Sequence, residues 1–63
     1  MDNRVVLVPV RGNEVGKALG GVSRSTVYRL IEADELTAVH IGARIFVTAR
    51  SITAYLDRIT ASA

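Results

Sequence analysis

The chain has 63 residues and no cysteine, which together allow one domain and exclude both a disulfide framework and a thiolate zinc site. Hydrophobic residues make up 49% of the chain, enough for a packed core, and a single histidine, His40, cannot build a metal site alone. The formal net charge is +2, and every cation except Lys17 is an arginine, whose planar guanidinium suits phosphates and guanine edges.

An apolar run from Val5 to Val10 lies near the N-terminus. It is far too short to span a bilayer and lacks the long apolar core and cleavage site of a signal peptide, so we expect a cytoplasmic protein. Val5 to Val8 is rich in β-branched residues, and Pro9 follows. Because proline donates no hydrogen bond to a sheet, this pattern predicts an edge strand or a strand end.

A short helix is predicted from Glu14 to Leu19. Arg11 to Asn13 precedes it as a turn, and Asn13 is expected to cap it with a side-chain oxygen. The pair Gly20-Gly21 ends this helix, because glycine readily adopts the left-handed conformation found after helix C-termini. Together with the helix that follows, this arrangement predicts a helix-turn-helix.

The second helix is predicted from Ser23 to about Ala33. Ser23 is a strong N-cap, and Val22 before it is spaced to pack against Val27 as a hydrophobic staple. The helical spacing predicts a buried stripe made of Val27, Leu30 and Ile31. The other faces carry Arg24, Ser25, Tyr28 and Arg29. A solvated acidic turn is expected to follow, with Glu32, Asp34 and Glu35.

A β-hairpin with Gly42 in its loop is predicted over residues 39–47. A three-residue loop brings β-branched residues to the core face by pairing Ile41 with Ile45 and Val39 with Val47. A two-residue loop would instead place Arg44 on the same face as the apolar residues of the first strand. We therefore expect the three-residue register, with His40 and Phe46 on the outer face.

The last predicted helix follows Thr48, its expected N-cap. An amphipathic stripe runs along it through Ile52, Tyr55, Leu56 and Ile59. Residues from Thr60 to Ala63 are expected to fray. The whole chain, 1–63, reads as one domain with a core over about residues 5–59.

The segments Ser23 to Ile31 and Ala38 to Arg44 resemble the second helix and the wing of the excisionase-type, MerR-like winged-helix family. Leu36 between them and the ending Ala54-Tyr55-Leu56 match as well. The chain departs from the family at Val15-Gly16, where paired alanines are usual, and in its less basic wing. The resemblance implies an α+β winged helix-turn-helix with three short helices, a β-hairpin wing and an N-terminal edge strand.

The same resemblance implies that the partner is double-stranded DNA, with the second helix in the major groove and the wing on backbone or minor groove. The residues it implies for DNA binding are Arg24, Ser25, Thr26, Tyr28, Arg29 and Arg44. Members of the excisionase branch bind tandem sites cooperatively, bend DNA and direct a phage integrase toward excision. Integrase and neighbouring copies are then further partners, with Phe46 and the Val5 to Val8 strand as candidate self-association surfaces. The location would be the host bacterial cytoplasm or nucleoid.

Other interpretations are open on the sequence alone. A small stand-alone transcription regulator fits the same motifs, and the low net charge with an outward Phe46 fits a protein-interaction adaptor on a winged fold. Arg24 and Arg29 are also compatible with a solvated helix face, and Tyr28 with the margin of the core. No nucleophile paired with a base, phosphate loop or supported carboxylate pair is visible, so neither an enzyme nor a cofactor is expected.

Overall fold

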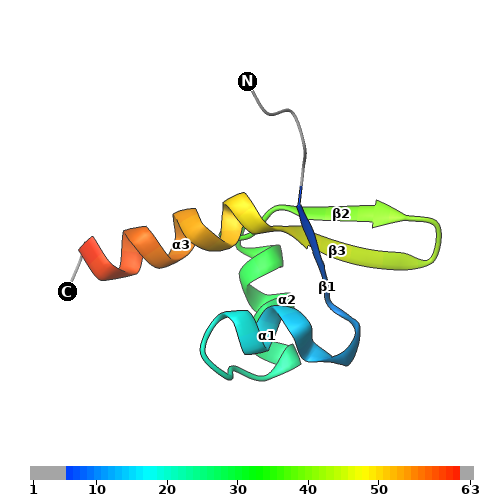
Figure 1. Cartoon of the computed structure of the whole chain (residues 1–63), viewed down its shortest axis with the longest axis horizontal. Coiled ribbons are helices and arrows are strands. Elements are labelled where there is room, and N and C mark those ends of the chain that lie inside the picture. Colours follow the sequence, from blue (N-terminus) through cyan, green and yellow to red (C-terminus); the bar gives the residue numbers. More distant parts are fainter. Residues whose placement is uncertain (1–5, 62–63) are drawn as a thin grey trace.

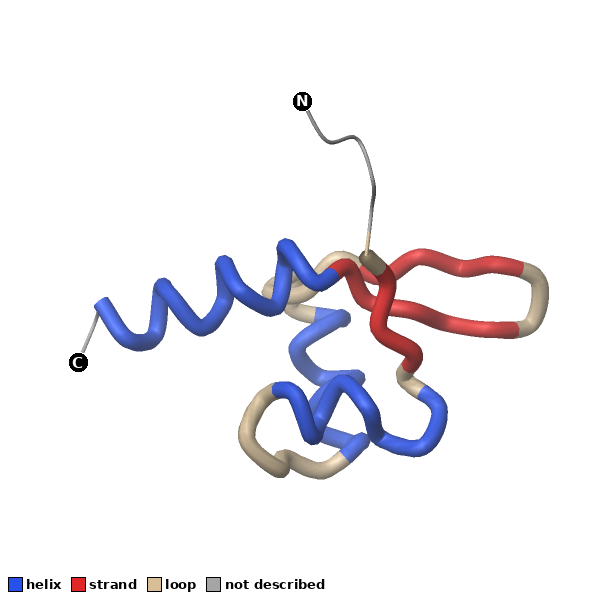
Figure 2. Tube along the Cα trace, in the orientation of Figure 1, coloured by secondary structure: helices blue, strands red, loops and turns tan. Residues whose placement is uncertain are grey.

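Three α-helices and a three-stranded antiparallel sheet make up residues 6–61, the part of the chain that the computed structural model describes (Figures 1 and 2). In chain order the elements are β1 (Leu7–Pro9), the 3₁₀ turn η1 (Arg11–Asn13), α1 (Glu14–Ala18), α2 (Arg24–Glu32), β2 (Ala38–Ile41), β3 (Arg44–Thr48) and α3 (Ala49–Ala61). In Figure 1, α1 and α2 lie together below the sheet, and α3 projects away from it. This is the expected α+β winged helix-turn-helix, with β2 and β3 as the wing.

β1 is an edge strand, as predicted, in a sheet of order β1-β3-β2. Pro9 lies within it, opposite Phe46. The next residue, Val10, donates its N–H to the Ile45 carbonyl at 3.1 Å, so the Pro9 nitrogen points away from β3, where no donor is needed. Val5, the first residue of the predicted strand, lies outside the described residues.

The hairpin has a two-residue loop, so the predicted three-residue register is wrong. The observed pairs are Ala38 with Val47, Val39 with Phe46, His40 with Ile45 and Ile41 with Arg44. Gly42 has a φ of +61°, the sign that the first residue of a two-residue type I′ or II′ loop requires. His40 consequently shares a sheet face with Ile45 and the buried Val47. Phe46 is on the outer face, as predicted.

This register creates an apolar outer sheet face, made of Pro9, Val39, Ile41 and Phe46. Phe46 is flanked by Pro9 on one neighbouring strand and Val39 on the other, and all three are half-buried. Ile41 nearer the loop is 53% exposed. Arg44 belongs to the same face, because it pairs with Ile41 and lies two residues from Phe46.

α1 ends at the glycine pair as predicted, but Asn13 does not cap its start with a side-chain oxygen. Gly20 has a φ of +95°, and the Gly21 N–H donates to the Gly16 carbonyl at 2.8 Å, which closes a Schellman motif. Asn13 is itself left-handed, with a φ of 58°, and its Nδ2 donates to the Val22 carbonyl at 3.0 Å. Asn13 therefore ties the start of α1 to the segment that leads into α2.

α2 begins at its predicted cap, where the Ser23 Oγ accepts a hydrogen bond from the Thr26 N–H at 3.3 Å. After the last turn, Asp34 takes the left-handed conformation with a φ of 63°. The Glu35 N–H then donates to the Leu30 carbonyl at 2.8 Å. This is a Schellman motif in which an aspartate stands at the position usually held by glycine.

α3 begins after Thr48, whose Oγ1 accepts from the Ser51 N–H at 3.2 Å, as predicted for the cap. The helix continues to Ala61, so Thr60 and Ala61 are helical in the structure, and their expected fraying stays a prediction. Residues 62–63 lie outside the described part of the chain.

An ion pair joins α3 to the turn after α2. Arg58 Nη2 lies 2.7 Å from Glu35 Oε1 and also donates to the Glu35 carbonyl oxygen at 3.2 Å. The Arg58 guanidinium carbon stands 5.9 Å from the centre of the Tyr55 ring. Glu35 is thus a partner of α3, although the sequence indicated only a solvated acidic turn.

The core is built from side chains of all three helices, of β3 and of two connecting segments. Its buried members are Val10, Val15, Val27, Leu36, Val47 and Ile52. The predicted stripes of α2 and α3 contribute Val27 and Ile52, and their other members pack at its edge: Leu30, Ile31, Tyr55 and Leu56. Ile59, on the projecting end of α3, is 48% exposed.

Candidate nucleic-acid interface

α2 presents a polar face opposite its buried stripe. Arg24 and Tyr28 lie one turn apart on this face, as do Ser25 and Arg29, and all four side chains are exposed. The Ser23 cap fixes where the helix starts, so these side chains leave the first two turns in a defined direction. A recognition helix reads DNA with such residues near its N-terminus.

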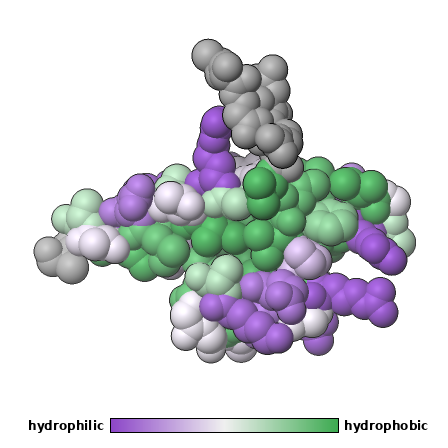
Figure 3. Space-filling view, viewed as in Figure 1, coloured by the Kyte–Doolittle hydropathy of each residue, from purple (hydrophilic) through white to green (hydrophobic). Residues whose placement is uncertain are grey.

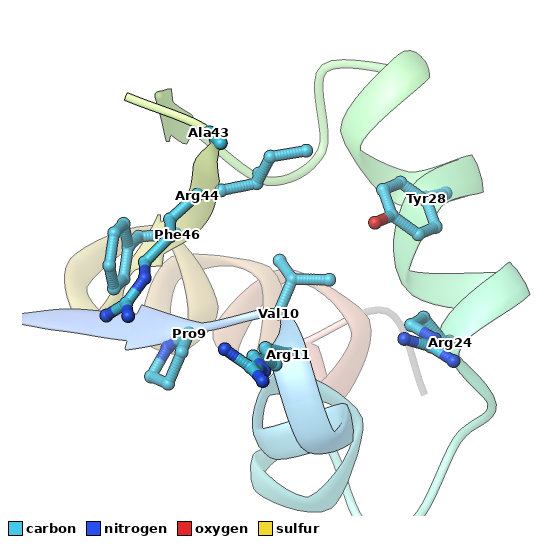
Figure 4. Close-up of a pocket in the computed structure, with 9 residues that line it drawn as sticks. Pro9, Val10, Arg11, Arg24, Tyr28, Ala43, Arg44 and Phe46 are labelled. Atoms are coloured by element: carbon cyan, nitrogen blue, oxygen red, sulfur yellow. The ribbon is translucent and has the colours of Figure 1, made fainter. Parts of the chain in front are cut away.

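A groove of about 470 Å³ lies between α2 and the sheet, close to the wing loop (Figure 4). Its polar lining comes from four side chains on three elements, which are Arg11, Arg24, Tyr28 and Arg44. Pro9 and Phe46 are among the apolar residues that line it. In Figure 4, Arg24 and Tyr28 project from α2 on one side, Arg44 comes from the hairpin on the other, and Arg11 lies between them.

The arginines of the groove have no acidic partner among the residues that the structure describes. Within residues 6–61, ion pairs join Lys17 to Glu14 at 3.5 Å and Arg58 to Glu35 at 2.7 Å, and no carboxylate there pairs with a groove arginine. A guanidinium without an acidic partner is available for an anion, and phosphate takes its forked donors in a bidentate manner. The groove is therefore suited to a phosphate-bearing ligand.

The structure brings together three of the predicted DNA-binding residues, Arg24, Tyr28 and Arg44, around the groove. Ser25 and Arg29 occupy the adjacent exposed row of α2, outside the groove lining. Thr26 is half-buried, and its Oγ1 lies 3.1 Å from the Ser23 Oγ, so its side chain takes part in the helix cap. Phe46 lines the groove from the sheet and belongs to the outer sheet face at the same time.

Arg11 is the polar groove residue that was not predicted as a site residue. The sequence identified residues 11–13 as a turn and nothing more, because three residues carry no periodicity that separates one face from another. The available signal was an arginine placed just after the strand-ending Pro9 and just before the first helix of a helix-turn-helix. Only the folded chain shows that this turn borders α2 and the wing.

Over residues 6–61, no helix is both long enough and apolar enough to cross a membrane. The same stretch holds no group of three histidine, aspartate or glutamate side chains arranged to bind a metal ion.

A family model described as a helix-turn-helix domain matches residues 14–60. The match runs from the first residue of α1 almost to the end of α3 and includes α2 and the hairpin. No curated protein and no solved structure matches the chain. The matched span contains every element of the groove except the β1–η1 segment that carries Arg11.

Proposed function

Since the chain belongs to the helix-turn-helix domain family, a DNA-binding family that includes excisionase-like proteins, we propose that α2 is its recognition helix. The observation that carries this proposal is the groove that Arg24 of α2 and Arg44 of the wing line from two sides, neither of them paired with a carboxylate within residues 6–61. On this proposal Ser25 and Arg29 face base edges in the major groove, and the wing follows the backbone or the minor groove.

The resemblance of α2 and the wing to the excisionase branch supports a more specific role. We propose a phage excisionase that binds tandem sites cooperatively, bends the DNA and directs integrase-mediated recombination toward excision. It acts by binding and not by catalysis, in the host bacterial cytoplasm or nucleoid. Its partners are double-stranded DNA, the integrase and neighbouring copies of itself, with Phe46 as a candidate contact between copies.

Alanine variants of the two arginines of α2 test the recognition helix. Arg24→Ala or Arg29→Ala is expected to cost about 1–3 kcal/mol of binding if that arginine reads a base edge, or to lower the salt slope by about one if it contacts a phosphate. Fluorescence anisotropy on a selected duplex and on its scrambled version distinguishes the two. Wild-type affinity and salt dependence in both variants would refute the assignment of α2.

Footprinting separates the excisionase from a stand-alone transcription regulator of the same family. Protection of repeated sites beside a phage attachment site supports the excisionase, and protection confined to a promoter supports the regulator. Absence of any gel shift on random duplex at low salt would instead favour an adaptor on a winged fold, because nonspecific phosphate contacts are strongest there.

A further inference from the structure

We propose that the groove between α2 and the wing holds a single phosphodiester strand of duplex DNA, gripped by Arg11 together with Arg24 and Arg44. This inference rests on the proposed function, since it names the part of the DNA that occupies the groove. It also gives a binding role to η1, which lies outside the matched helix-turn-helix span. The chemical class of the ligand is a phosphodiester, contacted without regard to base sequence.

Backbone hydrogen bonds of the residues on either side of Arg11 fix its position in the fold. Val10 before it is 3% exposed in the core and donates its N–H to the Ile45 carbonyl at 3.1 Å. The Asn13 N–H closes the turn by donating to the Val10 carbonyl at 3.0 Å. The Arg11 backbone is thus held between these bonds while its side chain is exposed at the groove. A held backbone reduces the entropy that binding must remove.

The size of the groove limits what it can hold. A volume of about 470 Å³ is within the range of pockets for small molecules, so the groove fits a nucleotide-sized stretch of chain and not a duplex. When α2 lies in the major groove of DNA, it is beside the DNA backbone that borders the major groove, and the wing reaches across the same DNA backbone. A single strand between these two elements meets the side chains that line the groove.

The charged, polar and apolar side chains of the lining each match a part of a phosphodiester strand. Three guanidinium groups offer charged donors to non-bridging oxygens, and no carboxylate within residues 6–61 competes for them. Tyr28, 42% exposed, adds a neutral hydroxyl donor on the α2 side. Pro9 and Phe46 supply apolar surface, which matches deoxyribose better than it matches a free inorganic anion.

The test measures the dissociation constant on a fluorescein-labelled duplex of mixed sequence, two helical turns long, at about 50 to 200 mM salt. Arg11→Ala is expected to weaken binding on the order of tenfold, since a charged hydrogen bond is lost. Its slope of log affinity against log salt should fall by about 0.9, the value for one phosphate. Arg11→Lys should keep the wild-type slope, because the charge is retained.

Lys17→Ala is the matched control. It removes the same formal charge, but Lys17 lies outside the groove lining and pairs with Glu14 at 3.5 Å, so its slope should stay at the wild-type value. Far-UV circular dichroism of each variant verifies the fold. A wild-type slope in Arg11→Ala, with wild-type protein bound to the duplex, overturns this inference and leaves the role of α2 intact. Failure of the wild-type protein to bind any duplex overturns the proposed function itself.

Discussion

At Gly16, α1 passes so close to the segment leading into α2 that no side chain fits. A Cβ added there would overlap the Val22 carbonyl oxygen and the Asn13 side chain. The carbonyl belongs to the backbone, and Asn13 is held against it by its 3.0 Å hydrogen bond, so neither group yields easily. This contact accounts physically for a glycine where the resembling family usually has alanine.

We expect Gly16→Ala to lower the free energy of unfolding by about 1–3 kcal/mol, the usual cost of overpacking, even though alanine favours helices by about 1 kcal/mol. Urea denaturation beside the wild type measures the change. Lys17→Ala on the exposed face of α1 is the control, with an expected change within about 0.5 kcal/mol. A Gly16→Ala protein more stable than the wild type would show that helix propensity outweighs the contact.

Substitution of Asp34 is expected to have the opposite effect, an increase in the stability of the protein. Asp34 takes a φ of 63° directly after α2, where an L-residue is strained and a negative charge is unfavourable beside the negative end of the helix dipole. Asp34→Gly is expected to raise the free energy of unfolding by about 0.5–1 kcal/mol. Asp34→Asn removes the charge alone, so the difference between the two variants isolates the backbone contribution. Thermal melts with no gain in Asp34→Gly would contradict the assigned strain.

Local chemistry predicted some residues well and others poorly, for a physical reason. Ser23 and Thr48 cap their helices as predicted, and Ser23 has the extended backbone that a capping side chain needs. Asn13 does not cap α1, because it ends the 3₁₀ turn in the left-handed conformation and its amide donates to the Val22 carbonyl. The role of Arg11 in the groove depends on tertiary placement, which no pattern of neighbouring residues reveals.

Among the elements, the helices were predictable and the register of the wing was not. α2 and α3 each have an apolar stripe, and every helix has a terminal signal within it or directly beside it in the sequence. In the hairpin, the apolar pattern favoured the three-residue register, which gathers four β-branched residues on one face, whereas the observed register divides them between the two faces. The observed register follows the Gly42 turn, and β1 gives Phe46 an apolar neighbour in Pro9 on the outer sheet face.

The turn therefore sets the shape of the wing, and its glycine can be tested. Gly42 has open space around it and a φ of +61°, so Gly42→Ala is expected to cost about 1–2 kcal/mol through backbone strain alone. Gly42→Asn should cost less, since asparagine tolerates this region better. Denaturant titration of both variants provides the comparison. Equal stability of Gly42→Ala and the wild type would mean that this turn does not determine the register.

On the scale of the whole molecule, polar and apolar surfaces are segregated over the face that Figure 3 shows. In the view of Figure 3, hydrophobic side chains gather along α3 and over the strands, and hydrophilic ones cover much of the α1 and α2 region. The exposed large hydrophobic residues outside the candidate DNA interface include Val6, Ile41 and Ile59. With α2 presented to DNA as proposed, we expect this apolar surface to be available for contacts with a neighbouring copy.

Because one copy carries little positive charge, contacts between copies would add to its affinity for DNA. With a formal net charge of +2, one molecule neutralises few phosphates, and affinity from that source grows with their number. We expect neighbouring copies on tandem sites to contact each other through the outer sheet face. A head-to-tail contact of this kind need not close into a dimer and would allow a short filament that curves the duplex.

The prediction is tested by titrating a duplex with one site against a duplex with three tandem sites. Affinity per site should rise about fivefold or more on the tandem duplex, the lower range of ordinary coupling energies.

Ile41→Ser, at a residue 53% exposed on the outer sheet face, should abolish that rise and leave the single-site affinity unchanged. His40→Ser is the control, because His40 is next to Ile41 in β2 but lies on the opposite sheet face, and it should keep the rise in affinity per site. Independent occupancy of the tandem sites, with no added bend in circular-permutation mobility, would rule out contacts between copies.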